Sequence, residues 1–313
     1  MELYQLETFL AVVEEKSFSR AAGRLHRTQS AVSQTINKLE EELGEKLFDR
    51  SSRDGSLTDA GHLLATYAEE LHNLREKARD ALRELRQLHQ GKLALAANEF
   101  TVLYLLPILN RFHRMHPTIK IEVNRALANQ IPGHVLRHNV EFGILSFEPE
   151  DEQLESVVFY KDDLVLVVYP GHPLARARKA TIRDLGAESF VAHNVLSPYR
   201  AKVIQAFKSH RTPLHMNVEL PTLESIKTFV RMGQAVALVP RIAVEEELRR
   251  GDLVDVVVSD MRFERKMRII MRSGAPLSHA GNAFLKVCAE MATTEKGRFF
   301  YEVARKKSRS VRA

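Results

Sequence analysis

Polar side chains that can contact nucleic acid recur along one segment near the N-terminus. They are short or end in an amide or ammonium group: Gln29, Ser30, Ser33, Gln34, Asn37 and Lys38. Such groups make hydrogen bonds with both base edges and phosphate oxygens. Between Arg20 and Lys38 there are four basic residues and no acidic one. The pattern indicates a surface that can face DNA.

An apolar stripe on the other side of this segment predicts the helix that carries those groups. Val32, Ile36, Leu39 and Leu43 recur at the spacing of a helix packed on one face. Residues 17–48 therefore predict two short helices joined by a polar corner, a helix-turn-helix. A plain helical bundle is the alternative. The polar face argues against it, because it lacks the Glu/Lys pairs usual on a merely solvated helix.

The first of these two helices is expected to pack closely on the second. Ser17 or Ser19 can cap it, and Ala21, Ala22 and Leu25 face inward. Small alanines permit the close backbone approach that a steep crossing angle requires. A further helix is expected before it, over residues 3–15, with a buried face of Leu6, Phe9, Leu10 and Val13.

A turn-forming segment, DRSSRDGSLTDAG, follows Phe48. Arg50 and Arg53 flank its serine- and glycine-containing turn, which suits a short β-hairpin wing along a phosphate backbone. Thr58 is a good cap for the next helix, which is expected to extend from about Asp59 to His89. The apolar positions of that helix are Leu63, Leu64, Tyr67, Leu71, Leu74, Ala78, Ala81, Leu82, Leu85 and Leu88. So long a stripe needs a partner, either a second copy of the chain or other parts of the same chain.

After Gly91 the pattern changes to short apolar strands that alternate with helices. Strands are expected at 93–97, 119–126, 141–146, 164–170, 189–194, 216–220 and 235–240, with helices at 102–116, 130–138, 198–209 and 225–232. Alternation at this spacing predicts parallel sheets covered by helices on both faces. Ligands of such folds bind beyond the carboxyl ends of the strands.

The net charge of +6 is not evidence for DNA binding by itself, because of where it lies. Seven Lys and Arg residues against Glu302 in residues 296–313 account for all of it. This tail is expected to be a frayed, solvated end, with auxiliary DNA or partner contact as the alternative. In the rest of the chain the positive and negative charges balance, so the case for DNA binding rests on where individual basic and polar residues lie.

Composition favours a soluble cytoplasmic protein. No run approaches the ~20 apolar residues that span a bilayer, and MELYQLETFL lacks a basic segment followed by an apolar core. We therefore expect neither membrane association nor secretion. The single cysteine, Cys288, excludes an internal disulfide and lies in a helical apolar pattern, so a buried structural thiol is expected rather than a reactive one.

Catalytic and metal-binding patterns are missing from the sequence. His113 and His116 lie three residues apart without a paired carboxylate nearby, and there is no HExxH, cysteine cluster, GxxxxGK[ST] or GxGxxG. Without a nucleophile–base constellation we expect no enzyme, no metal and no cofactor.

Taken together, the motifs resemble those of the LysR-type transcriptional regulators along nearly the whole chain. The matching segments are SFSRAAGRL (17–25), QSAVSQTINKLEEELGEKLFDR (29–50), LTDAG (57–61), LLPILNRFHRMHP (105–117), GHPLA (171–175) and MGQAVALVP (232–240). The resemblance implies an α/β multidomain protein. It would have an N-terminal winged helix-turn-helix, a long linker helix that dimerises and a C-terminal two-lobed periplasmic-binding-protein-like (Rossmann-like) effector domain.

The same resemblance implies domain limits and DNA-facing residues. The limits are 1–58 for the winged helix-turn-helix, 59–89 for the linker helix, 90–161 plus 268–295 for lobe I, 162–267 for lobe II and 296–313 for the basic tail. The family's recognition helix falls on 28–42. The implied DNA-facing residues are Thr28, Gln29, Ser30, Ser33, Gln34 and Lys38, with Arg50 and Arg53 in the wing.

The effector is expected in the cleft between the lobes. The implied lining comprises Asn98, Glu99, Phe100, Thr101, Ala128, Asn129, Ser146, Asn194, Leu196, Ser197 and Thr222. In the family a Ser or Thr commonly precedes the helix proline by seven residues and binds an anionic effector. Here that position is Phe100, with Thr101 one step along and the negative charge of Glu99 nearby. This departure favours a larger, apolar or cationic ligand, unless Glu99 points outward.

The implied partners are double-stranded operator or promoter DNA, a small-molecule effector, further copies of the chain in a dimer or tetramer, and RNA polymerase as a candidate. The competing interpretation is a solute-binding receptor of periplasmic-binding-protein type without a DNA role. The helix-turn-helix at the front of the chain and the missing signal peptide disfavour it. The effector, the target genes and the choice between activation and repression cannot be derived from these residues.

Overall fold

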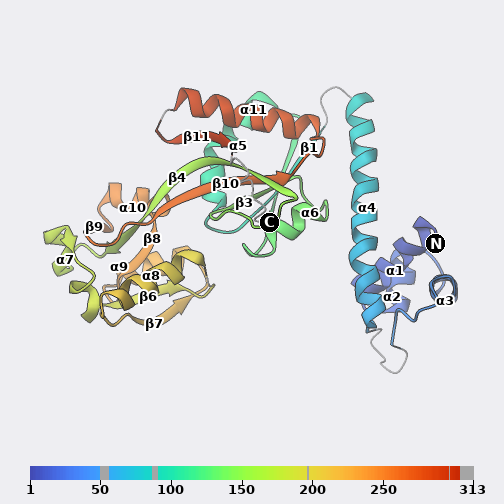
Figure 1. Cartoon of the computed structure of the whole chain (residues 1–313), viewed down its shortest axis with the longest axis horizontal. Coiled ribbons are helices and arrows are strands. Elements are labelled where there is room, and N and C mark those ends of the chain that lie inside the picture. The colour runs from blue at the N-terminus through green and yellow to red at the C-terminus, as the bar shows by residue number, and fades with distance from the viewer. Residues whose placement is uncertain (50–55, 87–90, 196, 296, 304–313) are drawn as a thin grey trace, which may run out of the picture. The chain divides into compact units, whose positions relative to one another are not determined.

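The structure is a computed structural model of the chain (Figure 1). It describes residues 1–49, 56–86, 91–195, 197–295 and 297–303. The chain divides into two compact units, one formed mainly by residues 1–88 and the other mainly by residues 89–313.

Helices make up most of the first unit. They are α1 (Leu3–Glu15), α2 (Phe18–Arg24), α3 (Gln29–Leu43) and α4 (Asp59–Arg86). Three members of the predicted stripe on α3, Val32, Ile36 and Leu39, are almost completely buried in a core that also contains Phe9. The fourth, Leu43, was expected to be buried and is 38% exposed. It is the last residue of α3, which ends at a left-handed Gly44, so it lies beyond the packed turns.

The caps and small residues of the helix-turn-helix act as the sequence predicts. The Ser17 hydroxyl accepts a hydrogen bond from the backbone N–H of Arg20, so Ser17 rather than Ser19 caps α2. Thr28 caps α3 by accepting from Ala31 N at 3.2 Å. Ala21 and Ala22 are buried, which lets α1, α2 and α3 pack closely.

The second unit has two lobes, and the first of them contains a mostly parallel set of strands. Its own elements are β1 (Lys92–Ala97), α5 (Val102–Met115), β2 (Lys120–Arg125), α6 (Ile131–Leu136), β3 (Phe142–Leu145), α11 (His279–Thr294) and β11 (Phe299–Val303). Strand β1 pairs in parallel with both β2 and β3. Helices α5 and α11 pack on each other, with the Phe112 and Phe284 ring centroids 5.9 Å apart.

The second lobe is built from shorter elements. They are α7 (Pro173–Ala177), β5 (Lys179–Ala180), η1 (Asp184–Ala187), β6 (Ser189–His193), α8 (Pro198–Ser209), β7 (His215–Leu220), α9 (Leu223–Arg231), β8 (Ala237–Pro240), η2 (Arg241–Val244), α10 (Glu245–Arg250) and β9 (Val254–Val258). Strands β6 and β7 form a parallel pair, and β5 pairs in parallel with β9. Buried apolar side chains from β4, β6, β8 and α9 form much of the core of this lobe.

Two long strands, β4 (Leu154–Val168) and β10 (Glu264–Arg272), connect the lobes (Figure 1). The first part of β4 pairs with β10 and β11, and its last residues pair with β8 and β9. All of these pairings are antiparallel, so the prediction of purely parallel sheets is wrong for the centre of the molecule. The reason is connectivity. The chain leaves the first lobe on β4 and returns beside it on β10, which must run in the opposite direction.

Two sequence-based expectations fail at the strands around β4. The residues before Leu164 were not predicted as a strand, yet β4 begins at Leu154. The C-terminal segment was predicted to be frayed, but Phe299–Val303 forms β11. Phe299 is buried against Tyr160, with ring centroids 5.3 Å apart, and an apolar anchor of this kind holds an edge strand in place. Residues 304–313 lie outside the described residues.

Candidate functional site

The polar face predicted for α3 lies on its outer side. Thr28, Gln29, Ser30, Gln34 and Lys38 are exposed, and Ser33 is half-buried. The first turn is ordered by its own side chains. Gln29 Nε2 donates to Ser33 Oγ at 2.9 Å, and the Thr28 and Ser30 hydroxyls are 3.0 Å apart. The helix therefore presents amide, hydroxyl and ammonium groups to its surroundings.

A buried carboxylate ties α3 to the segment that follows it. Glu40 is 2% exposed and accepts hydrogen bonds from Lys46 Nζ at 2.7 Å and from the backbone N–H of Leu47 at 2.9 Å. Burial disfavours the charged form of Glu40. The Lys46 ammonium and the backbone donors outweigh burial, so the pKa of this carboxyl lies below its usual value. Glu40 thereby fixes the entry to the predicted wing against α3.

The base of the wing is present in the described residues. Phe48 and Leu57 form an antiparallel bridge, and Asp49 N donates to Ser56 O at 2.8 Å. The Thr58 hydroxyl caps α4 by accepting from Gly61 N and also donates to Lys46 O. Gly61 is required here, because a Cβ at this position would lie 2.1 Å from Leu47 O. Arg50 and Arg53, the predicted wing contacts, lie outside the described residues.

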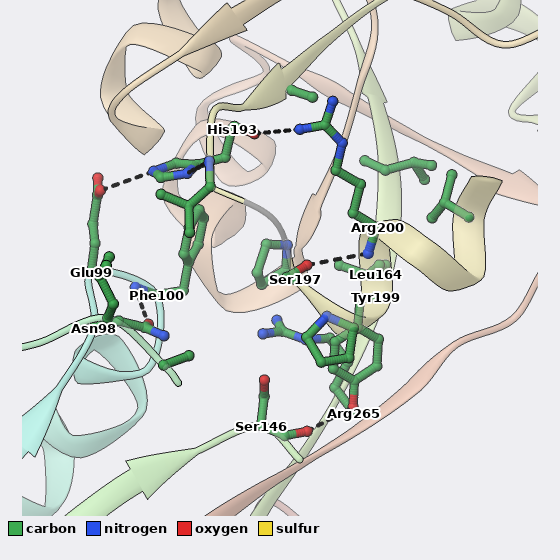
Figure 2. Close-up of a pocket in the computed structure, with 18 of the residues that line it drawn as sticks. Asn98, Glu99, Phe100, Ser146, Leu164, His193, Ser197, Tyr199, Arg200 and Arg265 are labelled. Carbon is green, nitrogen blue, oxygen red and sulfur yellow. Dashed lines mark hydrogen bonds and ion pairs between the residues drawn. The ribbon is translucent and has the colours of Figure 1, made fainter. Parts of the chain in front are cut away.

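A pocket of about 180 Å³ lies between the two lobes of the second unit (Figure 2). Six of the predicted effector residues line it: Asn98, Glu99, Phe100, Ala128, Ser146 and Ser197. They come from the ends of β1, β2 and β3 and from the start of α8, as expected for a fold whose ligands lie beyond the strand ends.

Other predicted residues lie away from the pocket. Asn129, Asn194 and Thr222 are exposed but do not line it, and Leu196 lies outside the described residues. Thr101 is 1% exposed because its hydroxyl turns inward. It accepts from Asn98 N at 3.1 Å and donates to Ile144 O at 3.4 Å. Thr222 caps α9, where its hydroxyl accepts from Ser225 N.

Several lining residues were not predicted from the sequence. The polar ones are Arg125, His193, Tyr199, Arg200 and Arg265. Arg265 lies on β10, close to the predicted boundary at 267/268 between lobe II and the returning part of lobe I, and that position was the available signal. Tyr199 follows Ser197 by two residues in the first turn of α8. Its hydroxyl donates to Ser146 O at 2.9 Å and so joins the two lobes.

Glu99 does not point away from the pocket. One carboxylate oxygen accepts a hydrogen bond from Leu223 N at 2.8 Å, and the other lies 3.5 Å from His193 Nε2 (Figure 2). Phe100 contacts the same histidine, with ring centroids 4.9 Å apart. The negative charge of Glu99 is therefore held by the start of α9 and by His193.

The opposite side of the pocket carries a buried cation. Arg265 is 5% exposed and donates from Nη1 to the Tyr104 hydroxyl at 3.0 Å. Tyr104 in turn donates to Asp162. Burial raises the pKa of Tyr104 above its usual value, which keeps the phenol protonated as a donor. The guanidinium carbon of Arg265 lies 5.0 Å from the centre of the Tyr199 ring.

The described residues contain neither a metal-binding cluster nor a membrane-spanning helix. No three His, Cys, Asp or Glu side chains among them come together in a way that would hold a metal ion. In the same part of the chain, no helix is both long and apolar enough to cross a membrane.

Comparison with known proteins identifies the family. Residues 3–62 match the model of the bacterial regulatory helix-turn-helix protein, lysR family, and residues 86–293 match the LysR substrate binding domain. A probable RuBisCO transcriptional regulator of Synechocystis sp. is 30% identical over 91% of this chain and 84% of that protein. Its counterpart in Cyanophora paradoxa is 31% identical over 90% and 89%. The fold resembles the crystal structure of CbnR, a LysR family transcriptional regulator, with a TM-score of 0.72 and 22% identity over 93% of this chain and 99% of that one. The chain belongs to the LysR family of transcriptional regulators.

Proposed function

We propose that α3 reads bases in the major groove of operator DNA and that the wing contacts phosphates. The exposed polar face of α3 carries this proposal, because Gln34 and Lys38 lie on the solvent side of a helix whose other side is held rigidly in the core. Gln34 is the residue with the bidentate hydrogen bonding that discriminates adenine. Arg53, by contrast, would contribute charge without sequence preference.

The regulator would act as a dimer or a dimer of dimers. Helix α4 supports this proposal, because four large apolar side chains on it are exposed: Leu63, Tyr67, Leu71 and Leu74. Their spacing of four, four and three residues places them in one stripe, and a second α4 is the simplest partner that covers it. Two recognition helices would then enter half-sites about one turn of DNA apart, or multiples of that.

The pocket between the lobes would bind the small-molecule effector. Binding there would favour one relative position of the lobes and so shift the population of oligomer conformations that fit the operator. In this assignment residues 1–58 bind DNA, 59–89 dimerise, and 90–161 with 268–295 and 162–267 form the two lobes. The protein would act in the cytoplasm without catalysis, with RNA polymerase as a further candidate partner and residues 296–313 as a basic tail.

The comparisons support a test of DNA binding and suggest which DNA to test first. CbnR, a structural neighbour, has also been solved in complex with its target DNA. The relatives cited above are named as RuBisCO transcriptional regulators. The first fragments to test are therefore the region upstream of the protein's own gene and any RuBisCO promoter of the same genome.

Filter binding to an operator and to a base-substituted operator tests the proposal. Gln34→Ala should lose the preference between the two DNAs, whereas Arg53→Ala should weaken binding to both and flatten the salt dependence. Gln234→Ala, an exposed glutamine of the second lobe, is the matched control and should behave as wild type. Equal loss on both DNAs for Gln34→Ala would refute base reading. Lack of binding to any upstream fragment would instead favour a solute receptor.

A further inference from the structure

We propose that the pocket between the lobes takes an organic anion and that Arg265 pairs with its anionic group. The inference deepens the effector role proposed above and rests on it. It names the chemical class of the ligand and the residue that anchors it. The anion would be a carboxylate or a phosphate ester, since the planar guanidinium fork matches both with two parallel hydrogen bonds.

Arg265 is a buried cation whose hydrogen bonding is incomplete. Its side chain lines the pocket, it is 95% buried, and its Nε is buried without a hydrogen-bond partner. Its Nη1 donates a hydrogen bond to the neutral Tyr104 hydroxyl. Within the described part of the chain no carboxylate forms an ion pair with it; Asp162 is reached only through Tyr104. A buried guanidinium in this state gains most from an anion.

The backbone donors that anions often use at helix starts are already occupied by the protein's own oxygens. Asn98 Oδ1 accepts from the N–H groups of Phe100 and Thr101 at the start of α5. Glu99 accepts from Leu223 N at the start of α9, and Ser197 Oγ accepts from Arg200 N in α8. A ligand anion placed there would have to displace these groups and would meet the Glu99 charge. The anion is therefore directed to the Arg265 side of the pocket. This proposal departs from the larger, apolar or cationic ligand that Phe100 and Glu99 favour in the sequence, because Leu223 N and His193 already hold the Glu99 carboxylate.

The other charged groups of the lining are Arg125, His193, Arg200 and Glu99. Arg200 forms an ion pair with Glu219 and donates to His193 O, and its Nε, like that of Arg265, is buried without a hydrogen-bond partner. The His193 ring lies 3.5 Å from Glu99, so Arg200 and His193 each have a carboxylate neighbour, which Arg265 lacks within the described residues. Arg125, at the end of β2, adds an exposed guanidinium to the lining, and its strand is separated from β10 by β1 and β3. The lining thus holds three arginines and one carboxylate, and a charge balance of this sign favours an anion over a cation.

The remaining walls define the body of the ligand. They are apolar and include Leu164, Phe190, Val203, Met216, Leu238 and Pro240. The cavity of about 180 Å³ is slightly larger than the roughly 150 Å³ apolar cavity known to bind benzene. A compact body of about six carbons that carries one anionic group therefore fits both the volume and the chemistry.

Isothermal titration of the full chain with matched probes tests the inference. The probes are cyclohexanecarboxylate, its neutral amide cyclohexanecarboxamide, cyclohexyl phosphate, and inorganic phosphate at the same ionic strength. We expect at least one of the two organic anions to bind at least tenfold more tightly than the amide, because a hydrogen-bonded charge pair is lost in the amide. The carboxylate and phosphate arms show which anionic group fits. If inorganic phosphate binds more tightly than both organic anions, the proposal that the apolar walls bind the body of the ligand is contradicted.

Variants of β10 identify the anchor. Arg265→Gln should reduce binding of the preferred organic anion at least tenfold and leave the amide unchanged. Arg265→Lys retains the charge and should keep a weaker preference for the anion. Lys266→Gln is the matched control. The Lys266 side chain is exposed and does not line the pocket of Arg265, so this variant should bind as wild type. A circular dichroism melt of each variant confirms that it folds.

The outcomes separate this inference from the proposed function. The inference is wrong if anion and amide bind equally, if neither organic anion binds, or if folded Arg265→Gln binds the anion as wild type. Operator binding, measured in parallel, is expected to persist in Arg265→Gln. An Arg265→Gln variant that loses anion binding but keeps operator binding would support the role of Arg265 as the anchor. A wild-type protein that binds no operator would instead refute the DNA role.

Discussion

The Glu99 carboxylate accepts a 2.8 Å hydrogen bond from the backbone N–H of Leu223. Glu99 lies just after β1 of the first lobe, and Leu223 is the first residue of α9 in the second. The same carboxylate contacts His193, 3.5 Å away. A side chain of one lobe thus occupies the positive end of a helix dipole in the other, beside the pocket.

Replacing this carboxylate should loosen the contact between the lobes. In Glu99→Gln the amide oxygen can still accept from Leu223 N, but the interactions with the helix dipole and with His193 weaken. We expect a loss of about 0.5–1.5 kcal/mol in the free energy of unfolding. Hydrogen exchange at the start of α9 should become faster. Denaturant unfolding with exchange mass spectrometry measures both.

Glu150→Gln is the matched control for this prediction, since it removes an exposed carboxylate that follows β3. It should leave both the stability and the exchange rates unchanged. Unchanged exchange at Leu223 in Glu99→Gln would show that the carboxylate does not hold the two lobes together.

The sequence predicts the α3 face well and the pocket only in part, and the difference is physical. The residues of the α3 face lie within eleven positions of one helix, so periodicity alone places them on one side. The pocket is assembled from strand ends far apart in the chain. Asn98 and Ser146 follow short apolar strands, which is a local signal. Arg265 reaches the pocket through the pairing of β10 with β4, a long-range register that composition does not encode.

The buried carboxylate of Glu40 should make the first unit sensitive to acid. Its folded-state pKa lies below the unfolded value of about 4.3, so the folded state binds fewer protons near that pH. The stabilisation is fully present above the unfolded pKa and is lost as the pH falls through the folded pKa. We expect Glu40→Gln to lower the free energy of unfolding by about 1–3 kcal/mol at pH 7, with a smaller difference from wild type below about pH 4.

Denaturant melts of wild type, Glu40→Gln and Glu41→Gln at pH 7, 5 and 3.5 measure this dependence. Glu41 is the next residue on α3 and is exposed, so its replacement should have little effect at any pH. A difference between wild type and Glu40→Gln that stays constant from pH 7 to pH 3.5 would contradict the role given to the ionised carboxylate.

The thiol of Cys288 should be unreactive in the folded protein. It is 2% exposed within the core of the first lobe, as the sequence predicts, and burial raises the pKa of the thiol well above its usual value. Since the thiolate is the reactive form, an aromatic disulfide reagent should label the native chain only at the rate of unfolding. In denaturant it should label one thiol per chain. Rapid labelling of the native protein would show that this part of the core opens.

The exposed apolar stripe of α4 predicts how the protein associates. Leu71 lies in its middle and is 42% exposed, between Tyr67 and Leu74. A charge at this position would have to be buried in a helix pair. Leu71→Asp should therefore shift the protein towards monomer and raise the dissociation constant of the dimer at least tenfold. Sedimentation equilibrium measures this shift.

Glu69→Ala changes an exposed residue of the same helix outside the stripe and serves as the control. It also alters the charge by one unit, in the opposite direction to Leu71→Asp, so a general electrostatic effect would change association in opposite directions in the two variants. We expect this variant to associate as wild type and to retain operator binding, whereas Leu71→Asp should bind single half-sites weakly. If Leu71→Asp remains fully dimeric, α4 is not the main contact between copies, and the exposed stripe must be covered by another part of the same chain.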